Sequence, residues 1–172
     1  YPDRAMCATS SVGGEAITWC GSGWTGQPAV FERNGETWVA FGAYDRHVHF
    51  LDFDTGEAKL PSFPTGDIIK GSVTIDPDGY PLLYTGSRDN NYRVIAFDGA
   101  EPRELWALNA FDVSPTKWNN DWDGAGLILR DHLLVGGENS QFHVVKLNRG
   151  YDENGMVTVE PELVFNRPGW DE

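Results

Sequence analysis

One plan of apolar runs and turns occurs three times along this sequence. The three copies run from Gln27 to Phe63, from Gly71 to Leu108 and from Gly124 to Phe165. Each contains a short apolar run, a turn, an apolar run that ends in Gly, an acidic loop, and an alternating run that ends in Asp or Asn. The glycines that end the second run lie 44 and 50 residues apart and are Gly42, Gly86 and Gly136. Such a repeat indicates a chain that stacks copies of one supersecondary unit.

Four strands in each copy, at a period of about 45 residues, are typical of the blades of a β-propeller. The 20 Gly and 10 Pro among the 172 residues also favour many short strands over long helices. We therefore predict an all-β fold built from blades of four antiparallel strands. The alternative is a plain antiparallel sandwich in which the similarity of the three copies is accidental.

Three blades do not close a ring, because propellers typically have four to eight. The predicted ring is therefore incomplete within residues 1–172, and an open ring exposes apolar blade faces and sheet edges. Two explanations stay open: the sequence is a fragment of a larger propeller, or another chain completes the ring. Residues 1–24 are expected to form a hairpin of a preceding blade, ahead of blades at 27–63, 71–108 and 124–165.

Two stretches resemble a known repeat. The segment VHFLDFDTGEAKL, and the segment YRVIAFD followed by RELWAL, are similar to blades of pyrroloquinoline-quinone-type (quinoprotein) propellers. The resemblance implies that Trp106 is buried and packs against the neighbouring blade. The pattern departs from the family in three places: Asp98-Gly99 lacks the Thr-Gly turn, Asn148 replaces an Asp, and Leu60 stands where a tryptophan is expected.

The same resemblance implies an activity as an alternative to simple binding. A quinone-dependent dehydrogenase would use pyrroloquinoline quinone, and those enzymes commonly carry two sequence-adjacent cysteines beside the cofactor. Cys7 and Cys20 are not adjacent, which argues against this cofactor here.

The two cysteines fall on a predicted hairpin whose turn is Gly13-Gly14. Opposed residues of a two-residue hairpin have numbers with a constant sum, and Cys7 and Cys20 share the sum of the two turn glycines. The pair falls on a non-hydrogen-bonded rung, where Cα atoms lie about 4.5 Å apart, so a disulfide fits. A disulfide implies an oxidising compartment: the periplasm, the cell surface or the outside. The alternative is a pair of buried thiols in a cytosolic chain.

A ligand-binding face is expected at one end of the blades. In a four-stranded antiparallel blade, the loop between the second and third strands emerges on the same side as the loop that enters the first strand. The side chains in these loops mix charges with tryptophan, as ligand sites do. They include Trp24, Asp45, His47, Asp67, Lys70, Arg88, Asp89, Asn90, Asp121, Trp122, Asp123, Glu138 and Asn139. The alternative is that the acidic members cap their own turns by accepting hydrogen bonds from backbone amides.

Calcium is the one metal that the sequence suggests. Asp121 and Asp123 place oxygen ligands at alternate positions ahead of Gly124, which suits a hard cation. The spacing lacks the bidentate acid of an EF-hand, so a solvated or self-capping turn is the alternative.

The net charge argues against two classes of partner, and the hydropathy argues against a membrane span. The chain has 13 Lys and Arg against 26 Asp and Glu, a net charge of −13, which disfavours nucleic acid and anionic membranes. It has no apolar run of about 18 residues and so no predicted membrane span. We therefore expect an extracytoplasmic binding or scaffold module for a protein or small-molecule ligand, with no assigned catalytic residue. The alternatives are a quinone-dependent dehydrogenase domain, a lyase or a hydrolase on a propeller.

Overall fold

The computed structural model describes residues 6–22 and 25–170 and contains three four-stranded antiparallel sheets. The first blade consists of β3 (Ala29–Arg33), β4 (Glu36–Gly42), β5 (His47–Asp52) and β6 (Phe63–Pro64). The second consists of β7 (Thr74–Ile75), β8 (Leu82–Gly86), β9 (Asn91–Ala96) and β10 (Arg103–Asn109). The third consists of β11 (Leu127–Leu129), β12 (His132–Gly136), β13 (Gln141–Lys146) and β16 (Glu162–Pro168). The prediction of an all-β fold with four-stranded antiparallel blades is confirmed.

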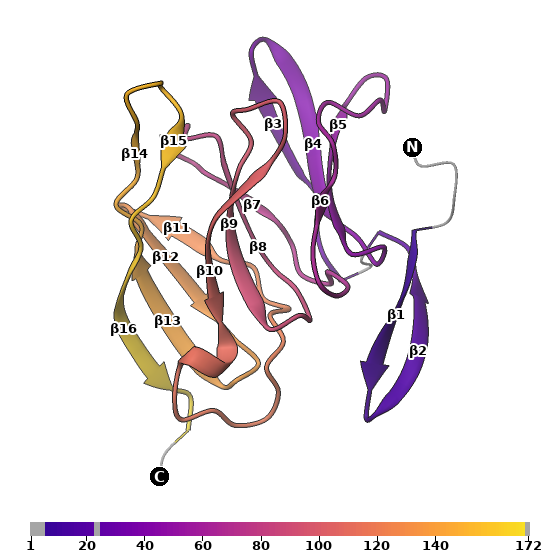
Figure 1. Ribbon diagram of the computed structural model, residues 1–172, viewed down its shortest axis with the longest axis vertical. Coiled ribbons are helices and arrows are strands. Elements are labelled where there is room, and N and C mark those ends of the chain that lie inside the picture. The colour runs from indigo at the N-terminus through magenta and orange to yellow at the C-terminus, as the bar shows by residue number, and fades with distance from the viewer. Residues whose placement is uncertain (1–5, 23–24, 171–172) are drawn as a thin grey trace.

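Two hairpins and one short turn of 3₁₀-helix lie outside the blades. The strands β1 (Cys7–Val12) and β2 (Glu15–Cys20) form a two-stranded sheet, at the lower right of Figure 1. The helical turn η1 (Ala110–Asp112) follows β10. The strands β14 (Gly150–Tyr151) and β15 (Val157–Thr158) form a hairpin between β13 and β16.

That extra hairpin closes for a local reason. The Asp152 side chain accepts hydrogen bonds from the backbone N–H groups of Asn154 and Met156, at 2.9 and 2.8 Å. Gly155 takes a positive φ of 78°, which glycine adopts at little cost. The Asn-Gly turn signal was present in the sequence, but strands of two residues are too short to show a periodicity.

The apolar core lies between the blades. One cluster joins the first and second blades and contains Trp38, Ala40, Val48, Phe50, Ile69, Val73, Leu83, Ile95 and Phe97. The other joins the second and third blades and contains, among others, Tyr84, Tyr92, Val94, Trp122, Leu133, Val135, Val145 and Leu147. The second blade therefore buries one face against the first blade and the other against the third, which is the packing expected of stacked repeats.

Trp106 packs against the second of these clusters but is only partly buried, whereas full burial was expected. It lies on β10, the outer strand of its sheet, beside a register shift between Glu104 and Trp106. An outer strand is covered less completely than a central one, because it has a neighbouring strand on one side only.

The glycines that end β4 and β8 sit where the next blade approaches most closely. A Cβ atom on Gly42 would lie 2.2 Å from Ile69 Cγ2, and one on Gly86 would lie 2.3 Å from Trp122 Cβ. Ile69 and Trp122 belong to the loops that enter the second and third blades, and both are fully buried. Only glycine leaves room for these contacts, which explains Gly at this position in the first and second blades.

The three blades form an open stack rather than a closed ring (Figure 1). The turns β4–β5, β8–β9 and β12–β13 and the loops that enter β3, β7 and β11 lie at one end of the blades, here called the loop side. The hairpin β14–β15 lies at the opposite end.

Candidate functional site

The same turn occurs three times on the loop side. In each copy a side-chain oxygen accepts a hydrogen bond from the backbone N–H two residues further on, at 3.1 to 3.2 Å. The residue between them has a positive φ of 63° to 71°. The capping residues are Asp45, Asp89 and Asn139. For Asp45 and Asp89 this is the local capping that the sequence left open as an alternative. In the third copy the expected cap was the acidic Glu138, and the structure has Asn139 in that role.

Each capping residue also contacts the side chain four positions later. Asp45 Oδ2 lies 3.0 Å from His49 Nε2, and Asp89 forms two hydrogen bonds with Arg93, at 2.6 and 2.8 Å. Burial would raise the pKa of Asp89, but the hydrogen bond and charge of Arg93 outweigh it and hold that pKa below its usual value. Burial would also raise the pKa of Asp45, but the hydrogen bond and charge of His49 outweigh it and hold that pKa below its usual value. These carboxylates are therefore ionised and paired within their own blades.

His47 and Asn90 are likewise engaged in their turns. The His47 ring places Nδ1 at 2.8 Å from the Asp45 carbonyl oxygen. The Asn90 carbonyl accepts hydrogen bonds from the Ala110 backbone N–H at 2.9 Å and from the Trp122 indole at 2.8 Å. Trp122, which was expected to face a ligand, is fully buried between the second and third blades.

Two ion pairs link neighbouring blades on the loop side. Lys70 Nζ lies 3.0 Å from Asp123 Oδ2, and Arg88 Nε lies 2.6 Å from Asp121 Oδ2. Lys70 precedes the second blade and Asp123 precedes the third, so the first pair bridges two loops. These pairs offset the repulsion that the crowded carboxylates would otherwise cause.

A third carboxylate, that of Glu138, joins Asp121 and Asp123 through an amide. Asn119 Nδ2 donates to Asp121 Oδ2 at 2.9 Å and to Glu138 Oε2 at 2.7 Å. Burial raises the pKa of Glu138, and the negative charges of Asp123 and Asp121 raise it further against the opposing hydrogen bond from Asn119. The pKa of Glu138 therefore lies above its ordinary value.

Asp121 and Asp123, the residues predicted to bind calcium, have protein cations as partners. Within residues 6–22 and 25–170, no group of three or more His, Cys, Asp or Glu side chains is arranged to hold a metal ion. Calcium would have to displace Arg88 or Lys70, and its binding here stays a prediction.

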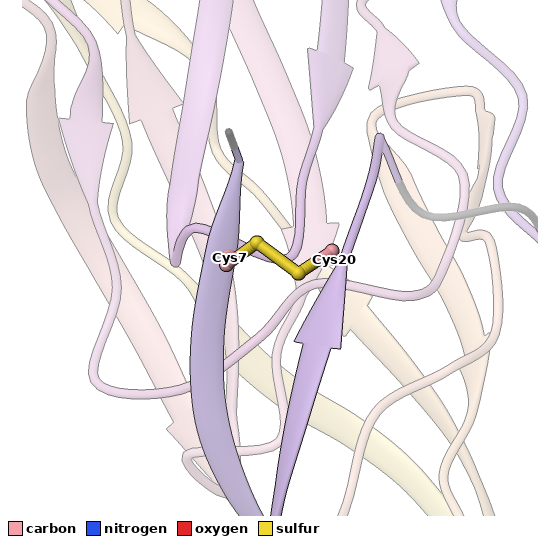
Figure 2. Close-up of a disulfide and its surroundings, with 2 residues drawn as sticks. All are labelled: Cys7 and Cys20. Atoms are coloured by element: carbon pink, nitrogen blue, oxygen red, sulfur yellow. A yellow bond between two sulfur atoms is a disulfide. The ribbon is translucent and has the colours of Figure 1, made fainter. Parts of the chain in front are cut away.

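The N-terminal hairpin carries the disulfide and rests on the loop side. Cys7 and Cys20 are directly opposed, with Cα atoms 4.1 Å apart, and form a disulfide between β1 and β2 (Figure 2). The predicted pairing is confirmed. That this hairpin belongs to a preceding blade stays a prediction.

Predicted ligand residues hold this hairpin in place. The Ser10 hydroxyl donates to Asp67 Oδ2 at 3.0 Å. Arg88 Nη2 donates to the Ser11 carbonyl at 3.0 Å, and Arg46 Nη2 donates to the Thr9 carbonyl. Thus Asp67 and Arg88 have a protein segment as their partner where a ligand was expected.

A pocket of about 220 Å³ lies between this hairpin and the entry loops. It is lined by Trp19, Thr25, Tyr44, Lys70 and Asp123. The Trp19 and Tyr44 rings meet edge to face at 5.7 Å, and Lys70 Nζ lies 5.8 Å from the centre of the Trp19 ring. Trp19 Nε1 and Asp123 Oδ1 are both buried and lack a hydrogen-bond partner among the described residues.

Lys70 and Asp123 of this pocket were predicted from the sequence, and the other three lining residues were not. Tyr44 immediately precedes Asp45 in the first turn, so the loop argument could have included it. Trp19 had no such signal, because nothing in a hairpin's register says where the hairpin will dock. Trp24 lies outside the described residues; in sequence it stands two residues before Gly26, as Trp122 stands two before Gly124.

A second, larger pocket of about 320 Å³ opens at the opposite end, between the first and second blades. Its charged lining residues already have partners. Arg33 lies over the Phe97 ring at 5.0 Å, Glu32 accepts a hydrogen bond from Thr37, and Asp76 contacts Arg149. The loop-side pocket is the better candidate site, because it retains unpaired polar atoms.

Neither the family models nor the curated proteins contain a match to this chain. Among solved structures, the chain is similar to BamB from Moraxella catarrhalis, with a TM-score of 0.35 and 12% identity. That alignment covers 87% of this chain and 56% of the other, so the chain spans little more than half the length of that protein. Among the described residues, no helix is long and apolar enough to cross a membrane.

Proposed function

We propose that this chain is an extracytoplasmic β-propeller module that binds a peptide segment of a protein partner on its loop side. The disulfide between Cys7 and Cys20 supports the location, because disulfides persist in oxidising compartments. The binding site is the pocket beneath the disulfide-closed hairpin.

The observation that carries this proposal is the pair of unpaired polar atoms in one pocket. Trp19 Nε1 is a hydrogen-bond donor and Asp123 Oδ1 is an acceptor, and both are buried without a protein partner among the described residues. Leaving such atoms unpaired costs about 1 to 3 kcal/mol each, so a ligand that pairs them gains that energy.

The chemistry of the pocket selects the class of ligand. Lys70 neutralises Asp123, so the pocket does not call for a charged group. The rings of Trp19 and Tyr44 provide an apolar wall. A peptide bond is neutral and presents one carbonyl acceptor and one N–H donor, which matches the two unpaired atoms. Pockets with apolar walls and few polar groups are typical of small-ligand sites.

The test is a titration of the ¹⁵N-labelled chain with the N-acetyl methylamides of the twenty common amino acids, followed by NMR. At least one member should shift the Trp19 indole N–H resonance in a saturable way. The Trp19→Phe variant assigns that resonance by its loss. Asp123→Asn replaces the unpaired acceptor with a donor at nearly constant shape, and it should weaken binding about tenfold or more.

Asp54→Asn is the matched control, because Asp54 is an exposed residue of a turn in the first blade and does not line the pocket. It should bind the same compound as the wild type does. The proposal is wrong when no member of the panel shifts the Trp19 resonance, or when Asp123→Asn binds as tightly as the wild type.

A further inference from the structure

The pocket at the end opposite the loop side lies between the turns of two neighbouring blades. One wall comes from the end of β3 and the turn that follows it, and the other from the turn between β7 and β8. Both turns have local causes. Gly35 takes a positive φ of 78° after Asn34, and Asp76 Oδ1 accepts a hydrogen bond from the Asp78 backbone N–H at 3.0 Å. The volume of about 320 Å³ is at the lower end of the range for ligand pockets, so it suits a small molecule.

The lining of this pocket is largely apolar. Phe97 is 3% exposed, and the Phe31 ring lies 5.5 Å from it, centre to centre. Ile75, Tyr80 and Pro81 complete the apolar part of the lining. A ligand that buries an apolar body here gains from its removal from water.

Arg33 differs from the other charged residues of the pocket, because its partners are rings. Its guanidinium carbon lies over the Phe97 ring at 5.0 Å and over the Trp38 ring at 5.5 Å. A guanidinium that lies over rings is held by its faces, whereas its five N–H bonds lie in its plane. No described residue accepts a hydrogen bond from Arg33 or forms an ion pair with it. The rings therefore hold the guanidinium in place and leave its N–H groups available to a ligand.

The lack of a carboxylate partner sets Arg33 apart in so acidic a chain. The sequence has 26 Asp and Glu against 13 Lys and Arg. Among residues 6–22 and 25–170, the arginines paired with a carboxylate are Arg46, Arg88, Arg93, Arg103 and Arg149. Arg130 and Arg167 are unpaired but exposed, whereas Arg33 is partly buried. Arg33 is thus a cation held beside a pocket without a counter-ion from the described chain.

The acidic groups that line the pocket are already engaged. The Asp76 carboxylate lies 2.6 Å from the Arg149 guanidinium. The Glu32 carboxylate accepts a hydrogen bond from the Thr37 hydroxyl at 2.6 Å. Glu32 also alternates with Arg33 along β3, so the two side chains leave opposite faces of the strand. The pocket therefore offers a ligand hydrogen-bond donors rather than carboxylates.

We propose that this pocket binds a small monocarboxylate with an apolar body, and that Arg33 holds its carboxylate. The edge of a guanidinium matches a carboxylate through two parallel hydrogen bonds. The Tyr80 hydroxyl, which has no hydrogen-bond partner among the described residues, supplies a further donor. One negative charge suits this site better than the two of a phosphate ester, because the Asp76 carboxylate and the net charge of −13 repel the second. This site is separate from the peptide pocket, and the proposal does not rest on that pocket.

NMR titrations of the ¹⁵N-labelled chain with 3-phenylpropionate and with hexanoate test the proposal. The signal to follow is the Arg33 Nε–H resonance, which the Arg33→Met variant assigns by its loss. At least one acid should shift this resonance in a saturable way. The matching amide, 3-phenylpropanamide or hexanamide, keeps the apolar body without the charge and should bind at least tenfold more weakly. Phenyl phosphate should also bind more weakly than the acid.

Calorimetry on two variants then assigns the binding to Arg33. Arg33→Met keeps apolar contact with the rings but loses the charge and the donors, so it should bind the acid at least tenfold more weakly. Arg167→Met is the matched control and should bind as the wild type does, because Arg167 is unpaired, exposed and outside the pocket. Circular dichroism should show the same strand content in both variants.

Four results would overturn the proposal. They are an Arg33 resonance that neither acid shifts, an amide that binds as tightly as its acid, phenyl phosphate that binds more tightly than the acids, and a folded Arg33→Met variant with wild-type affinity. Should Arg33→Met fail to fold, the comparison of acid and amide on the wild type still decides.

Discussion

At the scale of single residues, the histidines at one position of the third strand have different hydrogen-bond partners in the first and third blades. In the first blade, the Nε2 atom of His49 is hydrogen-bonded to the Asp45 carboxylate. Its Nδ1 atom is hydrogen-bonded to the Ser62 hydroxyl oxygen, at 2.8 Å. The equivalent His143 faces the amide of Asn139 at 3.5 Å, and its Nδ1 has no partner among the described residues. Burial lowers the pKa of His143 to about 4. The structure therefore holds His143 in its neutral form.

The consequence is a loss of stability in mild acid. The pKa of His143 falls from 6.5 to about 4 on folding, so the unfolded chain binds the proton first as the pH drops. This contribution to the free energy of unfolding is fully present above pH 6.5 and disappears between pH 6.5 and about 4. Between pH 7 and pH 5, the wild type should lose about 2 kcal/mol more than His143→Gln does.

Urea unfolding of both proteins at the two pH values measures this difference. Equal losses for the wild type and His143→Gln would contradict the assignment.

At the scale of elements, the β1–β2 hairpin depends on its disulfide. A two-stranded hairpin is marginally stable on its own. Its long-range contacts include hydrogen bonds that involve Ser10, Arg46 and Arg88, and the contacts of the Trp19 ring with Tyr44 and Lys70. The Tyr44 backbone N–H also donates to the Gly21 carbonyl, just after β2, at 2.9 Å. The disulfide closes a separation of 13 residues, which is worth about 3 kcal/mol.

Reduction should therefore open this hairpin and leave the blades folded. Hydrogen exchange read by mass spectrometry should show protection of residues 7–20 falling about a hundredfold after reduction, with β8 and β9 unchanged. Reductant has one target, because the chain contains two cysteines and both are in this bond. A Cys7→Ser, Cys20→Ser double variant should show the fast exchange without reductant. Unchanged protection after reduction would mean that the docking contacts alone hold the hairpin.

At the scale of the whole molecule, Arg149 ties the second blade to the third. Its guanidinium lies 2.6 Å from Asp76, 2.8 Å from Asp78 and 2.8 Å from Asp131. The Asp76 carboxylate is fully buried and also accepts a hydrogen bond from the Tyr84 hydroxyl at 2.6 Å. Burial and the Asp76 carboxylate both raise the pKa of Tyr84, so Tyr84 remains the donor.

Loss of this cation should destabilise the whole chain. Arg149→Met leaves the Asp76 charge buried without its partner, which should cost about 3 to 5 kcal/mol in a urea unfolding experiment. Arg130→Met is the control for loss of an exposed arginine and should change stability by less than about 0.5 kcal/mol. A cost below about 1 kcal/mol for Arg149→Met would mean that another cation compensates for the buried carboxylate.

The sequence by itself determined the features that depend on near neighbours. The period-two pattern and the turn residues specify strands and hairpins locally, and the three copies share them. The disulfide followed from one hairpin's register, because opposed positions in a two-residue hairpin are set by counting from Gly13-Gly14. The capping by Asp45, Asp89 and Asn139 was also within reach, since it spans two residues.

Only the tertiary structure decided which loop side chains face solvent, a neighbouring blade or the hairpin. Trp122 and Asp123 are adjacent in sequence, yet the first is fully buried against Gly86 and the second lines the pocket. Trp19 joins that pocket from a strand far from it in sequence. These contacts depend on how each sheet is rotated against the next and on where the hairpin docks. The pairing register within a sheet fixes neither the rotation between sheets nor the place where the hairpin docks. Both arise from packing between segments that lie tens of residues apart in sequence.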